Sequence, residues 1–213
     1  MKNLLDILNW RYAVKKFDPN KKISEAKLNT LKEALRLTPS SLGLQPWKFL
    51  LVENPAIRAQ LQEHSWNQSQ ITEASHLIVL CRLEKIDEPY IDTWIDYKRT
   101  LGDRTEEALQ GYKQMILNLV INKHSDNPDF QTHYLEKQIY LALGNLLTSA
   151  AVLELDTCPI GGFDPQKYDE ILGLKEKGLR SCVVCPIGYR HAEDRYQNYP
   201  KARFPQEQIF ETI

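Results

Sequence analysis

Two short segments far apart in the sequence concentrate basic side chains that could bind an anion. RYAVKKFDP contains Arg11, Lys15 and Lys16, and YPKARFP contains Lys201 and Arg203 between two prolines. Residues two positions apart point to the same side of an extended segment, so Lys201 and Arg203 could hold one phosphate group together. Solvated surface charge is the alternative for each segment taken alone.

A third segment, TPSSLGLQPW, carries uncharged polar groups on a predicted loop between a helix and a strand. Its candidate ligand-binding residues are Ser40, Ser41 and Gln45. Together with the two basic segments, this loop predicts an anion site with polar groups around a planar ligand.

The sequence contains no motif that would assign chemistry to side chains. The Walker A, GxGxxG, HExxH and GxSxG patterns are absent. The five histidines, at positions 64, 76, 124, 133 and 191, show no ligand-like spacing, so no metal site is expected. Since no acid, base or nucleophile constellation is found, we expect any catalysis to come from a bound cofactor.

Cys182 and Cys185 form a CVVC pair, which could be read as a redox or metal motif. The surrounding RSCVVCPIG is typical of a strand, where residues three apart point to opposite faces. A redox pair stands at a helix N-terminus, and a zinc pair stands in a turn with a second ligand pair. We therefore expect two buried strand cysteines with no redox or metal role.

Composition and charge exclude several classes of protein. The 213 residues carry a net charge of −1, from 27 Lys and Arg against 28 Asp and Glu, whereas nucleic-acid binding favours a basic excess. No stretch reaches the about 20 apolar residues of a membrane span, and the first residues lack a secretory signal. We expect a cytoplasmic protein with no nucleic-acid or membrane partner.

Periodicity and capping residues predict strands separated by helices rather than by hairpins. Asn3 and Ser24 are candidate N-caps, and Pro39 would stop the helix that follows Ser24. This order, with a long helical middle that lacks strands, favours an α+β fold whose sheet is covered by helices. The predicted strands are 47–53, 76–81 and 180–185, and the further helices are 55–63, 88–101, 103–122 with Asp103 and Glu106 as a capping box, 132–155, and one opened by Asp164–Pro165.

The predicted helix over 132–155 is the most informative element. From Ile139 to Leu153 it is apolar on every side apart from Asn145, Thr148 and Ser149. Such a helix must be buried all round, which a chain of this size achieves with difficulty. We expect a second copy of the chain to cover part of it. A core helix of a monomer is the alternative.

Five segments occur in the order found in the FMN-dependent nitroreductases, and the chain resembles that family over nearly its whole length. They are RYAVKKFDP, PSSLGLQPWKF, CPIGGFDP, GLKEKG with VVCPIGY, and YPKARFP. The similarity is strongest to the branch of oxygen-insensitive NAD(P)H nitroreductases and dihydropteridine reductases. The resemblance implies a nitroreductase-like α+β fold with a central, mainly antiparallel sheet flanked by helices. It also implies one domain over residues 1–213 with a helical lid at about 88–130, and an intertwined homodimer with FMN at its interface.

The resemblance also implies which residues bind FMN. The phosphate is assigned to Arg11, Lys201 and Arg203, with the Ala13 backbone nearby, and Tyr12 and Pro39 belong to the same site. Lys15 is assigned to the pyrimidine edge, and the other subunit would supply Ser40, Ser41 and Leu42, with Gln45 assisting. The ring is assigned to Asn67 and Gln70, and to the backbone N–H groups of the segment Pro159, Ile160, Gly161 and Gly162. On a variable lid over residues 112–121, Tyr112 and Met115 are candidate substrate contacts, or else ordinary residues of an amphipathic helix.

Three positions depart from the family pattern. Ala13 replaces a frequent serine, Gly161 replaces a frequent glutamate, and Gln70 stands where close relatives carry a lysine near flavin N1 and O2. Reduced flavin carries negative charge at that edge, so the missing cation should favour oxidised flavin. The hypothesis is a lower reduction potential than in lysine-bearing relatives.

The function implied is ping-pong transfer from NADH or NADPH, through flavin N5, to a small flat acceptor such as a nitroaromatic, quinone, pteridine or second flavin. The protein would supply positioning and electrostatics, and no side chain is expected to act as catalytic acid. One alternative is a flavin-binding module for storage or delivery. Two others are a relative with a different flavin reaction, and a structural protein with a fortuitous basic pocket.

Overall fold

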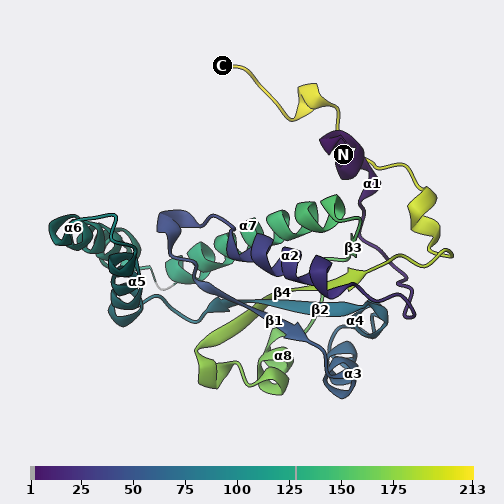
Figure 1. Cartoon of the computed structure of the whole chain (residues 1–213), viewed down its shortest axis with the longest axis horizontal. Helices are drawn as coiled ribbons and strands as arrows, with labels where there is room; N and C mark the ends of the chain where they lie inside the picture. Colours follow the sequence, from purple (N-terminus) through teal and green to yellow (C-terminus); the bar gives the residue numbers. More distant parts are fainter. Residues whose placement is uncertain (1–2, 128) are drawn as a thin grey trace.

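An antiparallel sheet of four strands lies at the centre of the computed structural model, which describes residues 3–127 and 129–213 (Figure 1). The strands lie side by side in the order β1 (Trp47–Val52), β2 (His76–Leu83), β4 (Leu179–Gly188) and β3 (Asp156–Thr157). The α+β prediction and the three predicted strands are confirmed. β3 was not predicted, because two residues show no alternation that a sequence pattern could detect.

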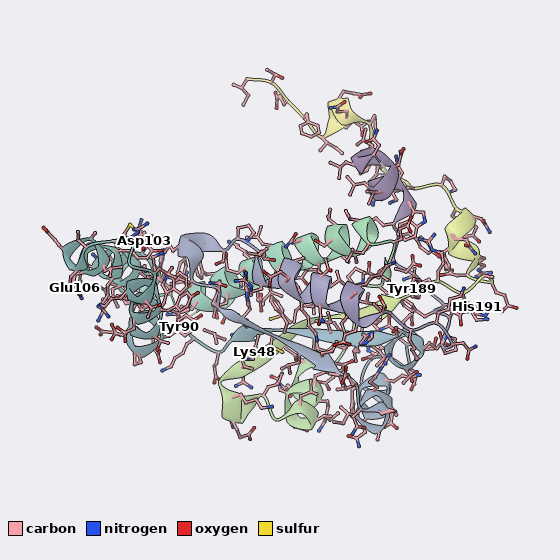
Figure 2. All side chains as sticks on the ribbon, in the orientation of Figure 1. Lys48, Tyr90, Asp103, Glu106, Tyr189 and His191 are labelled. Atoms are coloured by element: carbon pink, nitrogen blue, oxygen red, sulfur yellow. The ribbon has the colours of Figure 1, made fainter. Side chains whose placement is uncertain are left out.

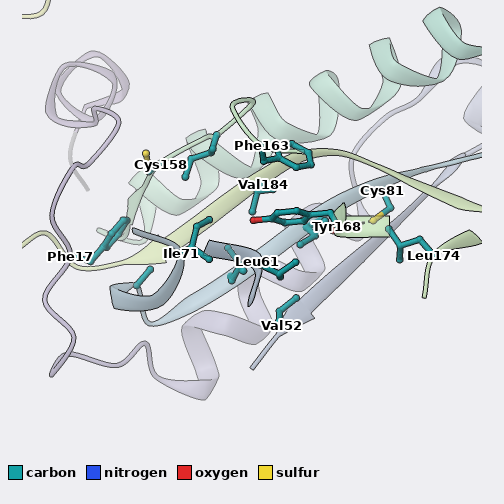
Figure 3. Close-up of a cluster of buried hydrophobic side chains, with 14 of the residues drawn as sticks. Phe17, Val52, Leu61, Ile71, Cys81, Cys158, Phe163, Tyr168, Leu174 and Val184 are labelled. Carbon is teal, nitrogen blue, oxygen red and sulfur yellow. Dashed lines mark hydrogen bonds between the residues drawn. The ribbon is translucent and has the colours of Figure 1, made fainter. Parts of the chain in front are cut away.

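Helices cover both faces of the sheet (Figure 1). On one face, α2 (Glu25–Arg36) and α7 (Phe130–Val152) pack over a hydrophobic cluster that includes Leu31, Leu80 and Leu146. The opposite face carries a second cluster, which includes Phe17 and Tyr168 (Figure 3). The helices that supply this second cluster are α3 (Pro55–Glu63), α4 (Gln70–Glu73) and α8 (Pro165–Leu172).

A β-bulge between β2 and β4 changes the orientation of the CVVC pair. Leu80 is opposite Val183 and Cys81 is opposite Ser181, so Cys182 is the extra residue. Both Cys182 and Cys185 therefore pack with the cluster under α2 and α7, and the prediction that they point to opposite faces is wrong. All four cysteines of the chain are free thiols.

Burial keeps the CVVC thiols protonated near neutral pH. Desolvation raises the pKa of Cys182 to about 11, and burial also raises the pKa of Cys185. A protonated thiol is a poor nucleophile and a poor metal ligand, which agrees with the structural interpretation of this pair.

The helix starts follow local capping residues. Side chains of Asn3, Ser24, Asn54 and Asp164 accept backbone N–H groups at the starts of α1 (Leu4–Trp10), α2, α3 and α8. One predicted start is wrong: α6 (Glu106–Ile116) begins after Thr105, whose side chain accepts from the Ala108 N–H, and not at Asp103. The remaining short elements are one π-helical turn, Leu117–Ile121, and the 3₁₀ turns Ser41–Gly43, Asn122–His124, Lys175–Lys177, Arg195–Asn198 and Gln206–Gln208.

The predicted lid region contains two helices at one end of the molecule. In Figure 1, α5 (Glu88–Leu101) and α6 lie together at this end. They share a hydrophobic cluster, and the Lys113 ammonium bridges Glu88 at 2.9 Å and Asp92 at 2.5 Å. α5 ends at Gly102, whose φ of 68° suits a glycine.

α7 is not covered all round by its own chain. Ala142, Leu146 and Ala150 are buried. Tyr140 and Leu141, by contrast, are 55% and 52% exposed. α1 and the C-terminal segment project together from the body of the molecule near the C-terminal end of α7 (Figure 1). Among the described residues no helix has the length and apolar character that crossing a membrane requires.

Candidate functional site

The two basic segments meet in a cavity of about 460 Å³, which we call the basic cradle. One wall is formed by residues 9–13 and 15, and the other wall by residues 196, 197, 199–201 and 203. The Lys201 ammonium donates to the backbone carbonyls of Leu8 and Arg11, which joins segments 190 positions apart in sequence. The six residues that the resemblance assigns in these segments line the cavity: Arg11, Tyr12, Ala13, Lys15, Lys201 and Arg203. Lys16, the other basic residue of the first segment, does not line it and pairs with Glu193.

The charges of the cradle are arranged for an anion. Burial, followed by repulsion from Arg203, lowers the pKa of Arg11. Burial, followed by repulsion from Arg11 and Arg203, also lowers the pKa of Lys201. The buried Nε–H of Arg11 has no hydrogen-bond partner among the described residues. An anion that accepts from this donor would relieve both the repulsion and the cost of an unsatisfied buried group, so these residues fit a phosphate group.

The uncharged polar loop lies outside the cradle of its own chain. Residues 39–45 follow α2 and lie beside the α5–α6 end of the molecule, away from α1 and the C-terminal segment (Figure 1). Figure 2 labels Tyr90 near this loop, and labels His191, next to the cradle segment, at the opposite end. Within one chain, the structure therefore does not bring Pro39, Ser40, Ser41, Leu42 or Gln45 to the basic residues.

Tyrosine hydroxyl groups hold this loop by its carbonyls. Tyr112 donates to the Leu42 carbonyl, Tyr134 to the Ser41 carbonyl at 3.3 Å, and Tyr90 to the Leu44 carbonyl at 2.7 Å. Within the loop, the Gln45 N–H donates to Ser40 Oγ at 2.9 Å. These contacts stabilise an unusual backbone, since Leu42 and Gln45 have φ values of 55° and 49°.

A third group of predicted residues lies around the start of α4 and in the turn after β3. Asn67 and Gln70 precede and begin α4, and the Gln68 amide donates to the Gly162 carbonyl at 3.0 Å. Gln70 is buried. Asn67 is exposed, and its backbone adopts the left-handed conformation with a φ of 54°. The turn after β3 is thereby joined to the segment before α4. Contact of Asn67 or Gln70 with a flavin ring stays a prediction.

The turn after β3 offers fewer free amides than predicted. Pro159 has no N–H, and the Ile160 N–H donates to the Val184 carbonyl at 2.7 Å, as part of a bridge to β4. The prediction that Ile160 offers its N–H to a ligand is therefore wrong, because the edge of the sheet already uses it. Gly161 and Gly162 remain the candidates.

Trp66 is a candidate site residue that the sequence did not indicate. Its φ is 53° and it is 77% exposed, yet its indole ring lies against Gly162, where a Cβ would overlap it. Gly162 is therefore required for this contact, and Trp66 forms a flat apolar wall beside the turn. Its only sequence signal was a tryptophan within the polar stretch SWNQSQ.

The predicted lid contacts lie on α6. Tyr112 is half-buried with its hydroxyl on the Leu42 carbonyl, and Met115 is 41% exposed. Contact of either residue with a substrate stays a prediction. No cluster of His, Cys, Asp and Glu that could hold a metal ion occurs in the part of the chain that the structure describes.

Comparisons with known proteins point to one family. The model of the nitroreductase family matches residues 8–189. A Bacillus subtilis protein named as an NAD(P)H nitroreductase is 36% identical over 220 residues, covering 99% of this chain and 97% of that protein. The oxygen-insensitive NAD(P)H nitroreductase of Salmonella typhimurium is 30% identical over 210 residues, covering 96% and 97%.

A solved structure supports the fold. A protein from Exiguobacterium sibiricum, named as a nitroreductase and bound to FMN, superposes with a TM-score of 0.82 at 23% identity, covering 100% of this chain and 98% of its own.

The loop contact of Tyr112 can be tested without any ligand. We expect Tyr112→Phe to speed hydrogen exchange of the Gly43 and Leu44 amides by about fivefold, since the lost hydrogen bond contributes about 1 kcal/mol locally. Mass spectrometry of the 38–46 peptide measures this rate. Tyr97→Phe, an exposed tyrosine on α5, is the control. Unchanged exchange in Tyr112→Phe would show that the hydroxyl does not hold the loop.

Proposed function

This chain belongs to the nitroreductase family, and we propose that it is an FMN-dependent oxidoreductase that takes electrons from NAD(P)H and passes them in a ping-pong reaction to a small flat acceptor. The observation that carries the proposal is the basic cradle, in which a buried Arg11 N–H lacks a partner among the described residues. A structural relative of the chain that is bound to FMN supports the proposal, since the phosphate of FMN is an anion that the cradle could hold.

Each group of site residues has a role in this proposal. Arg11, Lys201 and Arg203 bind the phosphate, and Ala13 offers only backbone there because its side chain has no hydroxyl. When bound, FMN supplies the hydride chemistry at its isoalloxazine ring. Gly161 and Gly162 offer N–H groups to the ring.

The shape beside the turn suits a flat acceptor. Trp66 covers Gly162 and exposes an indole face beside the turn, and a planar ring could stack on that face. NADH or NADPH and then the acceptor would occupy this place in turn. A nitroaromatic, quinone or pteridine has the required shape.

We also propose that the active form is a homodimer. Tyr140 and Leu141 of α7 lie beside an open hollow of about 740 Å³, and Phe204 and Phe210 of the C-terminal segment are exposed. Large apolar surface of this kind is typical of an interface between subunits. A partner subunit would also explain why the 39–45 loop lies far from the basic cradle of its own chain. The four free cysteines agree with a reducing cytoplasm.

The visible spectrum of the purified protein tests the enzyme assignment. We expect a yellow protein with stoichiometric FMN that bleaches when NADPH or NADH is added without oxygen, and recovers its colour when a quinone is added. Bound flavin that neither nucleotide reduces would instead favour a storage or delivery module. A colourless protein that does not take up FMN would contradict the cofactor assignment.

A charged residue introduced on the exposed side of α7 tests the proposed homodimer. We expect Leu141→Glu to convert the protein to monomers in sedimentation or light scattering and to lose FMN, because a carboxylate in an apolar interface is not solvated. Ala59→Glu adds the same charge on exposed α3, on the other face of the sheet, and should stay dimeric. A Leu141→Glu protein that remains a flavin-loaded dimer would exclude this face as the interface.

Gln70 is expected to set the reduction potential of the bound flavin. Gln70→Lys should raise the two-electron potential by tens of millivolts, since about 1.4 kcal/mol of charge stabilisation corresponds to about 30 mV. A redox titration with a reference dye measures the change. Thr72→Lys adds the same charge at an exposed position of α4 and should shift the potential much less. Equal potentials in wild type and Gln70→Lys would refute the hypothesis.

A further inference from the structure

Asp194 lies between the two walls of the basic cradle, and it is only 2% exposed. Its side chain does not line the cavity, whereas its neighbours from Tyr196 onward do. It is therefore not a group that an anion would contact. A carboxylate inside the cavity would repel a phosphate, so a buried carboxylate behind it needs a different explanation.

The carboxylate of Asp194 binds both walls at once. Oδ2 accepts the backbone N–H groups of Lys15 at 2.8 Å and Lys16 at 3.2 Å, and the Tyr12 hydroxyl at 3.1 Å. Oδ1 accepts the Tyr196 N–H at 3.0 Å, which caps the 3₁₀ turn that leads to Lys201. One side chain thus binds the first wall at Tyr12 and Lys15, the residue after that wall at Lys16, and the second wall at Tyr196.

The charge of Asp194 is maintained by these contacts. Burial alone would raise its pKa, but the N–H donors of Lys15, Tyr196 and Lys16 outweigh that effect and hold the pKa below the ordinary value of an aspartate. The side chain is therefore an ionised acceptor at neutral pH, and hydrogen bonds to an ionised acceptor are among the strongest in proteins.

A neighbouring arginine holds the same wall from the other side. The Arg190 guanidinium donates to Asp156 at 2.6 and 2.9 Å, and it lies over the rings of Trp10 and Tyr12 at 4.3 and 4.5 Å from their centroids. Tyr12 is thus fixed at its ring by Arg190 and at its hydroxyl by Asp194. Its orientation is determined by the protein and does not depend on a ligand.

We propose that Asp194 is a positioning residue that assembles the basic cradle before the FMN phosphate arrives, by tying its two walls together. The proposal rests on the proposed function, since it takes the phosphate of FMN as the anion. The cradle needs such a tie because Arg11, Lys201 and Arg203 repel one another, as their electrostatic effects on Arg11 and Lys201 show. A site held open in its binding geometry loses less entropy when the ligand binds.

Asp194→Asn tests this role with little change in volume. The amide keeps one acceptor oxygen and replaces the other with an NH2 donor. The N–H group of Lys15 or of Tyr196 must therefore face this NH2 group. We expect the dissociation constant of FMN to rise by about tenfold to a hundredfold, the effect of losing one or two hydrogen bonds to a charged group. The dissociation constant of riboflavin, which lacks the phosphate, should change by less than about threefold.

The measured quantity is the ratio of the riboflavin and FMN dissociation constants, from quenching of flavin fluorescence by the apoprotein. A general loss of folding would weaken both ligands alike and leave this ratio unchanged. Arg11→Ala, which removes a direct phosphate contact, should lower the ratio in the same way as Asp194→Asn.

Asp169→Asn is the matched control. Asp169 on α8 is 8% exposed and accepts from the Ser181 N–H and hydroxyl at 2.9 and 2.7 Å, away from the cradle. Its substitution should lower the melting temperature and leave the ratio unchanged. Should Asp194→Asn not fold, Tyr12→Phe removes one of the same hydrogen bonds and should lower the ratio by about twofold to fivefold.

The outcomes separate the two proposals. A wild-type protein that binds FMN no better than riboflavin would overturn the phosphate assignment of the cradle, and with it the proposed function. A wild-type preference for FMN that survives intact in Asp194→Asn, or in Tyr12→Phe where Asp194→Asn does not fold, would overturn the positioning role of Asp194 alone.

Discussion

The pairing of residues 13–18 with β3 and with the residues that follow β4 determines where the basic cradle forms. The Val14 N–H donates to the Thr157 carbonyl at 3.1 Å, the Asp18 N–H to the Tyr189 carbonyl at 2.8 Å, and the His191 N–H to the Lys16 carbonyl at 2.9 Å. These bonds add the first basic segment to the edge of the sheet. The chain that leaves β4 then runs beside it, and Asp194 follows within a few residues. The position of the basic cradle is thus a consequence of strand pairing, and the charges of its side chains suit it to an anion.

Backbone strain marks the other two parts of the site. Leu42, Gln45, Trp66 and Asn67 are four of the non-glycine residues with positive φ among the described residues, and all lie in or next to segments that the resemblance assigns to the flavin. Left-handed conformations of such residues cost of the order of 1–3 kcal/mol each, so neighbouring contacts must hold them. Three tyrosines do so for the loop, and Gly162 provides the space for Trp66.

Local signals made most of the fold predictable, and long-range contacts account for what was missed. Ser24 and Asp164 start helices by accepting N–H groups of residues two or three positions later, so their roles can be seen in the sequence. The sequence predicted a cap at Asp103, whereas α6 begins after Thr105, whose side chain accepts the Ala108 N–H. The bulge at Cys182 depends on the register between β2 and β4. Asp194 had no local signal, because its partners Lys15 and Tyr12 lie about 180 positions away.

The distance in sequence between the two walls also has a consequence for how the protein is made. Arg11 is synthesised 190 residues before Lys201, and the carbonyl contact between them cannot exist until both have left the ribosome. β1 and β2 can pair with each other well before that point, since they are adjacent in the chain. The flavin therefore cannot act as a template for early folding. A ligand that needs both walls of the cradle can bind only after Lys201 and the rest of the second wall have been synthesised.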